Sequence, residues 1–156
     1  MSDTMIKTRE TKLDFAQLEM AAEVELGKFL AIAKARQDAG KGQNYMPGGL
    51  IDEVWHSKLK DETAYADFCK AHAGKVLAHN PNAGFGTLEW VSDYEARFGP
   101  LQTVWFADVS GRIDTNGLAE YRKTGIYVTS WDCTPDSGEN DHDSPDGGKR
   151  IRSWYP

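Results

Sequence analysis

The sequence has few cysteines, no long apolar run and no motif of the common nucleotide-binding or hydrolase families. Its two cysteines, Cys69 and Cys133, stand far apart, and neither belongs to a C-x-x-C pair. This spacing excludes zinc-ribbon and thioredoxin motifs. No segment approaches the roughly 18 apolar residues that a membrane-spanning helix needs, and the polar N-terminus lacks an apolar signal core. We therefore expect a cytoplasmic protein with reduced thiols and no membrane partner.

Positive charge is scarce as well. Lys and Arg number 18 and Asp and Glu number 24, which gives a formal net charge of -6. A surface that binds nucleic acid neutralises phosphates with clustered basic residues, so we expect no nucleic-acid partner. The P-loop, G-x-G-x-x-G and G-x-S-x-G motifs are absent. Because no complete catalytic constellation is present, we favour a non-enzymatic protein and keep an enzyme as the alternative.

Apolar residues at helical spacing are abundant, and cap residues stand where helices are expected to begin or end. These patterns predict helices over residues 12–38, 49–60, 62–73, 88–98 and 118–124. Two segments rich in β-branched and aromatic residues, 101–109 and 126–133, are typical of strands and can pair with each other. Residues 75–86 are predicted to be a short extended segment that enters a turn-rich loop, because Pro and Gly follow.

The predicted fold is mainly α: a single-domain helical bundle of four to five helices with a minor two-strand element near residues 101–133. A polar N-terminal arm, residues 1–11, precedes a helical domain of residues 12–133. Residues 134–156 are rich in acids and turn formers, which predicts an irregular acidic tail. A chain of 156 residues is long enough for one ordinary core.

Asp52 and His56 are one helical turn apart in the predicted helix 49–60. At this spacing a carboxylate can orient an imidazole, which suits a metal ligand, a proton-transferring histidine or a buried hydrogen-bonded one. We interpret Asp52, Trp55, His56 and His79 as a polar node that joins the second and third helices to the turn at His79.

A metal site is the alternative interpretation of the same region. Cys69 and His72 are three residues apart on one predicted helix, and with His56 and His79 they offer ligands suited to zinc or iron. A buried cysteine is also ordinary packing, because a free thiol behaves as a small apolar group. We therefore expect no cofactor and keep zinc or iron as the alternative.

The order of motifs from Phe29 to Phe106 resembles a known bacterial family. The matching parts are I-D-E-V-W-H at 51–56, Y-A-D-F-C at 65–69, H-N-P at 79–81 and F-G-P-L-Q-x-x-W-F at 98–106. They are similar to the glycine-rich-domain-like family, which shares its D-x-x-W-H helix with plant glycine-rich domain proteins. The resemblance implies a mainly helical fold without an established activity. It departs at Lys58, where the family pattern W-H-x-H has a second histidine, and this departure argues against a bound metal.

Three functions are compatible with the sequence. The first, which we favour, is a non-enzymatic interaction module that engages a protein partner through the acidic tail or an aromatic groove. Trp55, Trp90, Tyr94 and Trp105 could line such a groove, although aromatic residues at helical spacing are more often part of the core. The second is a metal-binding protein or metal-dependent enzyme, and the third is acid/base catalysis by Asp52 and His56. The sequence determines neither the partner nor the oligomeric state.

Overall fold

The structure is a computed structural model that describes residues 14–136. This part of the chain forms five α-helices, one 3-10 helix and three strands. The α-helices are α2 (Phe15–Asp38), α3 (Leu50–Lys58), α4 (Glu62–Ala73), α5 (Trp90–Phe98) and α6 (Thr115–Thr124). The other elements are β1 (Met46–Pro47), β2 (Ala78–Thr87), the 3-10 helix η1 (Thr103–Phe106) and β3 (Val128–Asp136). The predicted helices are confirmed in number, but the fold is α plus β rather than a helical bundle, because a three-stranded antiparallel sheet completes it.

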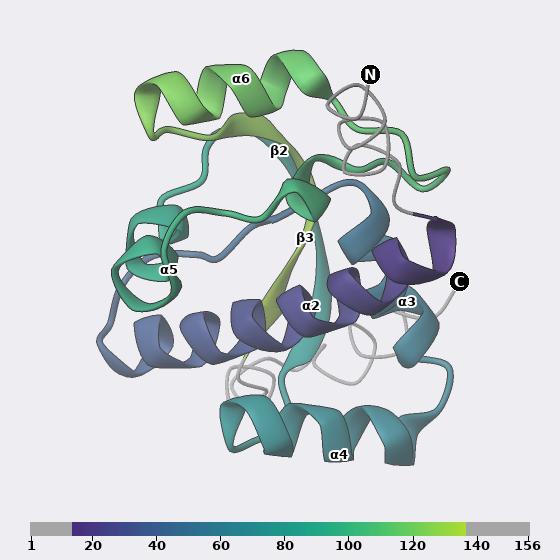
Figure 1. The fold of residues 1–156 in the computed structure, drawn as a ribbon. Coiled ribbons are helices and arrows are strands. Elements are labelled where there is room, and N and C mark those ends of the chain that lie inside the picture. Colours follow the sequence, from purple (N-terminus) through teal and green to yellow (C-terminus); the bar gives the residue numbers. More distant parts are fainter. Residues whose placement is uncertain (1–13, 137–156) are drawn as a thin grey trace.

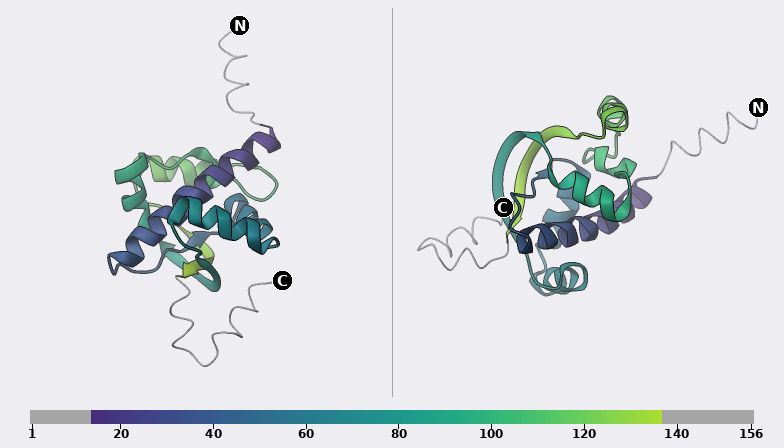
Figure 2. Two further views of the ribbon diagram at one scale, coloured as in Figure 1. Left: turned by 90° about the horizontal axis from the view of Figure 1, so that it is seen from below. Right: turned by 90° about the vertical axis from the view of Figure 1, so that its left-hand side faces the viewer.

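Helix α2 lies at the centre of the fold and contacts α3, α4, α5 and η1 (Figure 1). Asp14 begins the helix with a capping box, in which its carboxylate accepts a hydrogen bond from the Gln17 backbone N–H at 2.8 Å. Figure 2 shows α4 on one side of α2 and the sheet with α5 and α6 on the other. Because several neighbours cover α2, its buried residues occupy a broad face of the helix instead of a narrow stripe.

The sheet has the strand order β1-β3-β2, so β3 pairs on both sides. In the pairing of β2 with β3, His79 lies opposite Pro135 and Pro81 lies opposite Cys133. The register shifts between Pro81 and Gly84, and such a bulge lets a strand accommodate a proline. A Cβ atom at Gly84 would lie 2.6 Å from the Trp131 ring, so glycine permits the close approach of the two strands there.

The predicted pairing of residues 101–109 with 126–133 is wrong. The first segment forms η1, in which Val104, Trp105 and Phe106 are all buried. A strand sends consecutive side chains to opposite faces, whereas this short turn directs three neighbours into the core. The long partner of β3 is instead β2, whose Pro and Gly residues predicted a loop. The prediction of a loop from composition failed because a bulge accommodates Pro and Gly inside a strand.

The boundary predicted at residue 133 falls inside β3, which continues to Asp136. Backbone pairing with β2 and β1 extends the strand into residues whose composition is typical of a loop. The predicted arm of residues 1–11 and the rest of the acidic tail lie outside the described residues. None of the helices between residues 14 and 136 combines the length and apolar character of a membrane-spanning segment.

The four aromatic residues considered for a groove lie in the core, as their helical spacing favours. Trp55, Trp90 and Tyr94 have no exposed surface, and Trp105 is 4% exposed. The three tryptophan rings surround Phe29 in edge-to-face contacts, with centroid distances of 5.9, 5.0 and 6.1 Å. Aromatic pairs of this geometry stabilise a core beyond their burial alone. These side chains therefore hold α2, α3, α5 and η1 together and leave no aromatic groove.

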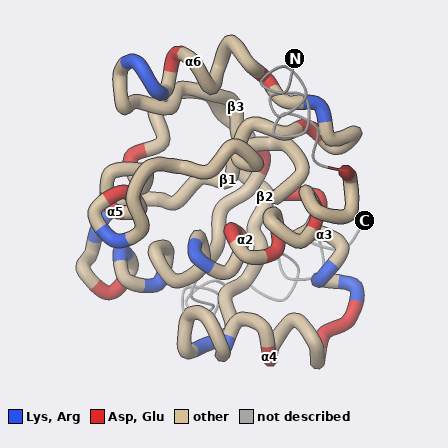
Figure 3. The backbone as a smooth tube through the Cα atoms, in the orientation of Figure 1, with Lys and Arg blue, Asp and Glu red and all other residues tan. Residues whose placement is uncertain are grey.

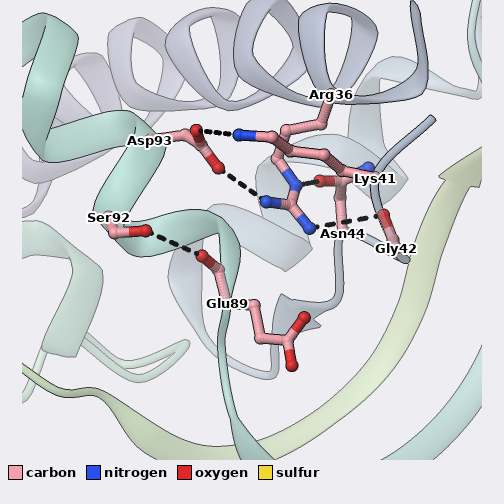
Figure 4. Close-up of polar contacts among 7 residues, drawn as sticks. All are labelled: Arg36, Lys41, Gly42, Asn44, Glu89, Ser92 and Asp93. Carbon is pink, nitrogen blue, oxygen red and sulfur yellow. Dashed lines mark hydrogen bonds and ion pairs between the residues drawn. The ribbon is translucent and has the colours of Figure 1, made fainter. Parts of the chain in front are cut away.

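Charged positions of both signs are distributed over the helices (Figure 3), and one ion-pair network is partly buried. Arg36, near the end of α2, is 5% exposed and donates to Asp93 on α5 at 2.6 Å and to Asn44 at 2.5 Å (Figure 4). Lys41 donates to the other oxygen of Asp93 at 2.9 Å. The network ties the end of α2 and the loop after it to α5.

Candidate metal centre

Asp52 and His56 lie one turn apart on α3, on the side that faces the sheet. The start of this helix is fixed by Gly49, whose φ of 158° favours glycine. A Cβ atom there would lie 2.8 Å from the Ala107 carbonyl oxygen, to which the Leu50 N–H donates at 2.9 Å. Close backbone contact with the end of η1 therefore sets the position from which α3 presents its two polar side chains.

Strands β2 and β3 supply the other two side chains, His79 and Cys133. Cys133 pairs with Pro81, two residues after His79. Residues two apart in a strand share a face, and a residue paired with one of them faces the same way. The pairing of the strands therefore places the imidazole and the thiol on the same face, opposite α3.

One oxygen, two nitrogens and one sulfur converge at this point. One ligand atom from each of Asp52, His56, His79 and Cys133 lies within 4.8 Å of all the others. From Asp52 Oδ1 the distances are 2.9 Å to Cys133 Sγ, 3.5 Å to His56 Nε2 and 4.0 Å to His79 Nε2. Zinc–ligand bonds of about 2.0–2.3 Å place the corners of a tetrahedron roughly 3.3–3.8 Å apart. Small side-chain adjustments are thus sufficient for the four residues to enclose one ion.

Burial controls the protonation of this cluster. Burial raises the pKa of Asp52, although the hydrogen bond from Cys133 and the nearby His56 lower it. Burial and the Asp52 carboxylate raise the pKa of Cys133, and burial and His56 lower the pKa of His79 to about 4. At neutral pH and without a metal, His79 is therefore neutral and the Cys133 thiol donates to Asp52. A bound cation would convert the Cys133 thiol to a thiolate, because coordination removes the proton of the thiol.

His79 is the least satisfied polar side chain of the group. It is 3% exposed, and neither ring nitrogen has a hydrogen-bond partner among the described residues. Its ring meets the rings of Trp55 and His56 at centroid distances of 4.6 and 4.4 Å. Leaving a buried polar group unpaired destabilises a protein by about 1–3 kcal/mol. A ligand that accepts the lone pair of Nε2 would satisfy one of the two nitrogens and reduce this penalty.

The structure brings three of the four residues of the predicted polar node, Asp52, His56 and His79, together with Cys133. Trp55 forms the wall beside them, and its indole N–H donates to Tyr65 Oη at 3.0 Å. The two predicted ligands on α4 lie outside the cluster.

Cys69 is fully buried, and its thiol interacts with Tyr65 and with the backbone of Leu77. His72 packs against the Phe68 ring at 4.4 Å and lies so close to Gly27 that a Cβ atom there would be 2.5 Å from the imidazole. Both side chains therefore fill the interface between α4 and its neighbours.

Cys133 is the candidate ligand that the sequence did not suggest. It lies far from His79 along the chain, in a segment predicted to pair with residues 101–109. The only signal for it is the register of β2 with β3, which becomes visible once these two strands are known to be partners.

Lys58, where the family pattern has a second histidine, takes no part in the cluster. Its ammonium pairs with Glu23 on α2 at 3.3 Å and lies 4.4 Å from the centre of the Phe68 ring. Residues 56 and 58 point in different directions on a helix, because two positions correspond to about 200° of rotation. The lysine at position 58 therefore leaves the four candidate ligands intact.

Comparison of this chain with protein-family models, with curated proteins and with solved structures gives no match. The likeness to the glycine-rich-domain-like family therefore stays a prediction from the motifs. The chemistry of the candidate site is inferred from the residues and geometry of this chain.

Proposed function

We propose that the protein binds one zinc ion through Asp52, His56, His79 and Cys133, and that this ion fastens α3 to the sheet. The observation that carries the proposal is the convergence of four ligand atoms from three elements within 4.8 Å of one another. One of these atoms belongs to a buried histidine without a hydrogen-bond partner in the described part of the chain. Buried polar groups are rarely left in this state unless an ion, a water or another group satisfies them.

The donor set favours zinc among the common divalent metals. Thiolate, imidazole and carboxylate are the zinc ligands of proteins, and four of them complete a tetrahedral site. Magnesium and calcium prefer oxygen ligands alone. Iron is the second candidate, because Asp52, His56 and His79 also compose the two-histidine, one-carboxylate set of non-haem iron proteins.

A role in structure rather than in catalysis follows from the number of ligands. Four protein ligands fill every position of a tetrahedral ion, as in structural zinc sites, whereas catalytic zinc keeps one position open. The His79 and Cys133 side chains are buried, and the His56 side chain is 35% exposed. His56 thus lies at the entry path for the ion. We therefore propose a non-enzymatic module whose zinc contributes to folding.

Metal content of the purified, untagged protein tests this proposal. We expect about one zinc ion per chain in the wild type and a marked loss in His79→Ala and in Cys133→Ser. Cys69→Ser is the matched control, because it removes a buried thiol outside the cluster and should retain zinc. Circular dichroism establishes that each variant is folded.

Two outcomes would contradict the proposal. One is a wild-type protein that stays empty after incubation with zinc salts, and the other is equal zinc retention by all three variants. Iron in place of zinc, with the same dependence on His79 and Cys133, would retain the site and change the metal.

A further inference from the structure

We propose that a groove between α2 and α3 binds a basic amphipathic helix of a partner protein. The groove has a volume of about 490 Å³, and its lining includes Phe15 and Met20 from α2, Val54 from α3 and Val109 from the loop after η1. On α3, these lining positions lie roughly opposite Asp52 and His56, as the helical period requires. The groove is therefore distinct from the candidate metal centre.

Exposed apolar side chains gather at this groove. Among the described residues, eight large apolar side chains are exposed, and three of them, Phe15, Met20 and Val109, line it. Their exposed fractions are 43%, 70% and 57%. Single exposed apolar residues are normal on a protein surface, whereas a contiguous group with a polar rim is typical of an interaction site.

The loop that carries Val109 is held in place before any partner binds. The Asp108 carboxylate accepts hydrogen bonds from the backbone N–H groups of Ser110 and Arg112, both at 2.9 Å, and from the Ser110 hydroxyl at 2.7 Å. Gly111 has a φ of 91°, and a Cβ atom there would lie 3.1 Å from the Phe15 ring. Such preorganisation lowers the entropy lost when a partner binds.

The charge of the lining identifies the chemistry of the partner. Glu19, Glu23 and Glu53 line the groove together with Lys58, so three negative charges and one positive charge give a net charge of -2. Lys58 already pairs with Glu23 at 3.3 Å. Figure 3 shows acidic positions on both helices. An apolar groove between two helices suits the apolar face of a third helix, and basic residues at the edges of that face complement the carboxylates. An anionic membrane surface would be repelled.

A synthetic peptide tests the proposal with the full chain. The probe is a fluorescent leucine–lysine peptide of about 15 residues, long enough to form a helix, with leucines at positions i, i+3, i+4 and i+7 and lysines elsewhere. Its dissociation constant is measured by fluorescence anisotropy for the wild type, Met20→Glu, Val109→Glu and Ile126→Glu. Ile126 is the matched control because it is 53% exposed and does not line the groove.

The substitutions separate groove binding from general attraction between opposite charges. All three variants gain one negative charge, so attraction alone would leave binding to the basic peptide unchanged or stronger. Occupation of the groove predicts binding about tenfold or more weaker in Met20→Glu and Val109→Glu and unchanged in Ile126→Glu.

Three results would overturn the proposal. The first is equal binding by all variants. The second is no binding by the wild type, the result expected if residues 1–13 of the chain occupy the groove. The third is self-association of the wild type in sedimentation experiments that Val109→Glu abolishes, which would make a second copy the occupant.

Discussion

His79 is the residue that separates a structural from a metal-binding interpretation of the cluster. A histidine that serves only the fold is expected to use its buried nitrogens in hydrogen bonds. Within residues 14–136, His79 has packing contacts with Trp55 and His56 but no hydrogen bond from either ring nitrogen. Its neutral state and its position beside a thiol and a carboxylate are the features that the proposed metal site requires.

The pH dependence of stability tests the protonation state of His79. In the metal-free protein, burial lowers its pKa from 6.5 to about 4. The unfolded chain therefore binds more protons than the folded chain between these values, and stability falls as the pH decreases from about 6.5 to about 4. The loss attributable to this residue is about 3 kcal/mol.

Urea unfolding at several pH values, with a chelator present, measures this loss. A His79→Gln variant provides the reference, because it keeps every other titrating group. The free energy of unfolding of the wild type should decrease relative to the variant over this pH range. Parallel curves for the two proteins would show that His79 is not a buried neutral imidazole.

Part of the candidate site could be predicted from the sequence. The four-residue spacing of Asp52 and His56 predicts that they share a helix face, and the motif order predicts that His79 lies in the same node. Cys133 could not be predicted in the same way, because its position depends on strand register, and register is set by pairing over long sequence distances. Cys69 has better local spacing to a histidine, yet α4 directs its thiol toward Tyr65.

Helix α3 links the candidate metal centre to the groove between α2 and α3. One face of this nine-residue helix carries Asp52 and His56, and the other forms a wall of the groove through Val54. Helices of this length are marginal by themselves and depend on tertiary contacts. An ion held between α3 and the sheet would therefore stabilise the helix that also shapes the groove.

The junction of α2 with α5 supports a prediction about Asp93, which pairs with both Arg36 and Lys41. Hydrogen bonds from Lys41 and Arg36 lower the pKa of Asp93 in the folded protein below its usual value of 3.8. The ionised Asp93 therefore stabilises the folded state above pH 3.8, and this stabilisation is lost as the pH falls through the lower pKa of the folded state. Asp93→Asn should destabilise the protein at pH 7 by about 1–3 kcal/mol, because Arg36 is buried and loses its charged partner.

Asp38→Asn is the matched control for Asp93→Asn. Asp38 also pairs with a lysine of α2, Lys34, but its side chain is 63% exposed. Exposed pairs contribute at most about 1 kcal/mol, so this variant should unfold close to the wild-type denaturant concentration. Equal destabilisation by both substitutions would contradict a special role for the Arg36 network.

The helices could be predicted from local signals and the sheet could not. Asp61 and Gly74 cap α4 at the residues expected from the sequence, since caps depend on neighbouring positions alone. In contrast, Pro81 and Gly84 indicated a loop in what is β2. Whether such a segment pairs as a strand depends on its partner, here Trp131 and the rest of β3.

The candidate metal centre lies where the helical part of the fold meets the sheet. Asp52 and His56 belong to the helices, and His79 and Cys133 belong to paired strands. An ion bound by all four would join the two parts and stabilise the folded state, because no such site is preformed in the unfolded chain.

Titration of the metal-free protein with cobalt(II), followed by absorption spectroscopy, tests whether these four residues bind a tetrahedral metal ion. Cobalt(II) can replace zinc in tetrahedral sites. Its absorption spectrum reports the geometry of the site and the presence of a sulfur ligand. We expect saturation at about one cobalt per chain, with intense visible bands of a tetrahedral ion and a thiolate charge-transfer band. The charge-transfer band should disappear in Cys133→Ser and persist in Cys69→Ser. Spectra of octahedral, solvent-like cobalt, or a charge-transfer band that survives Cys133→Ser, would contradict zinc binding at this site.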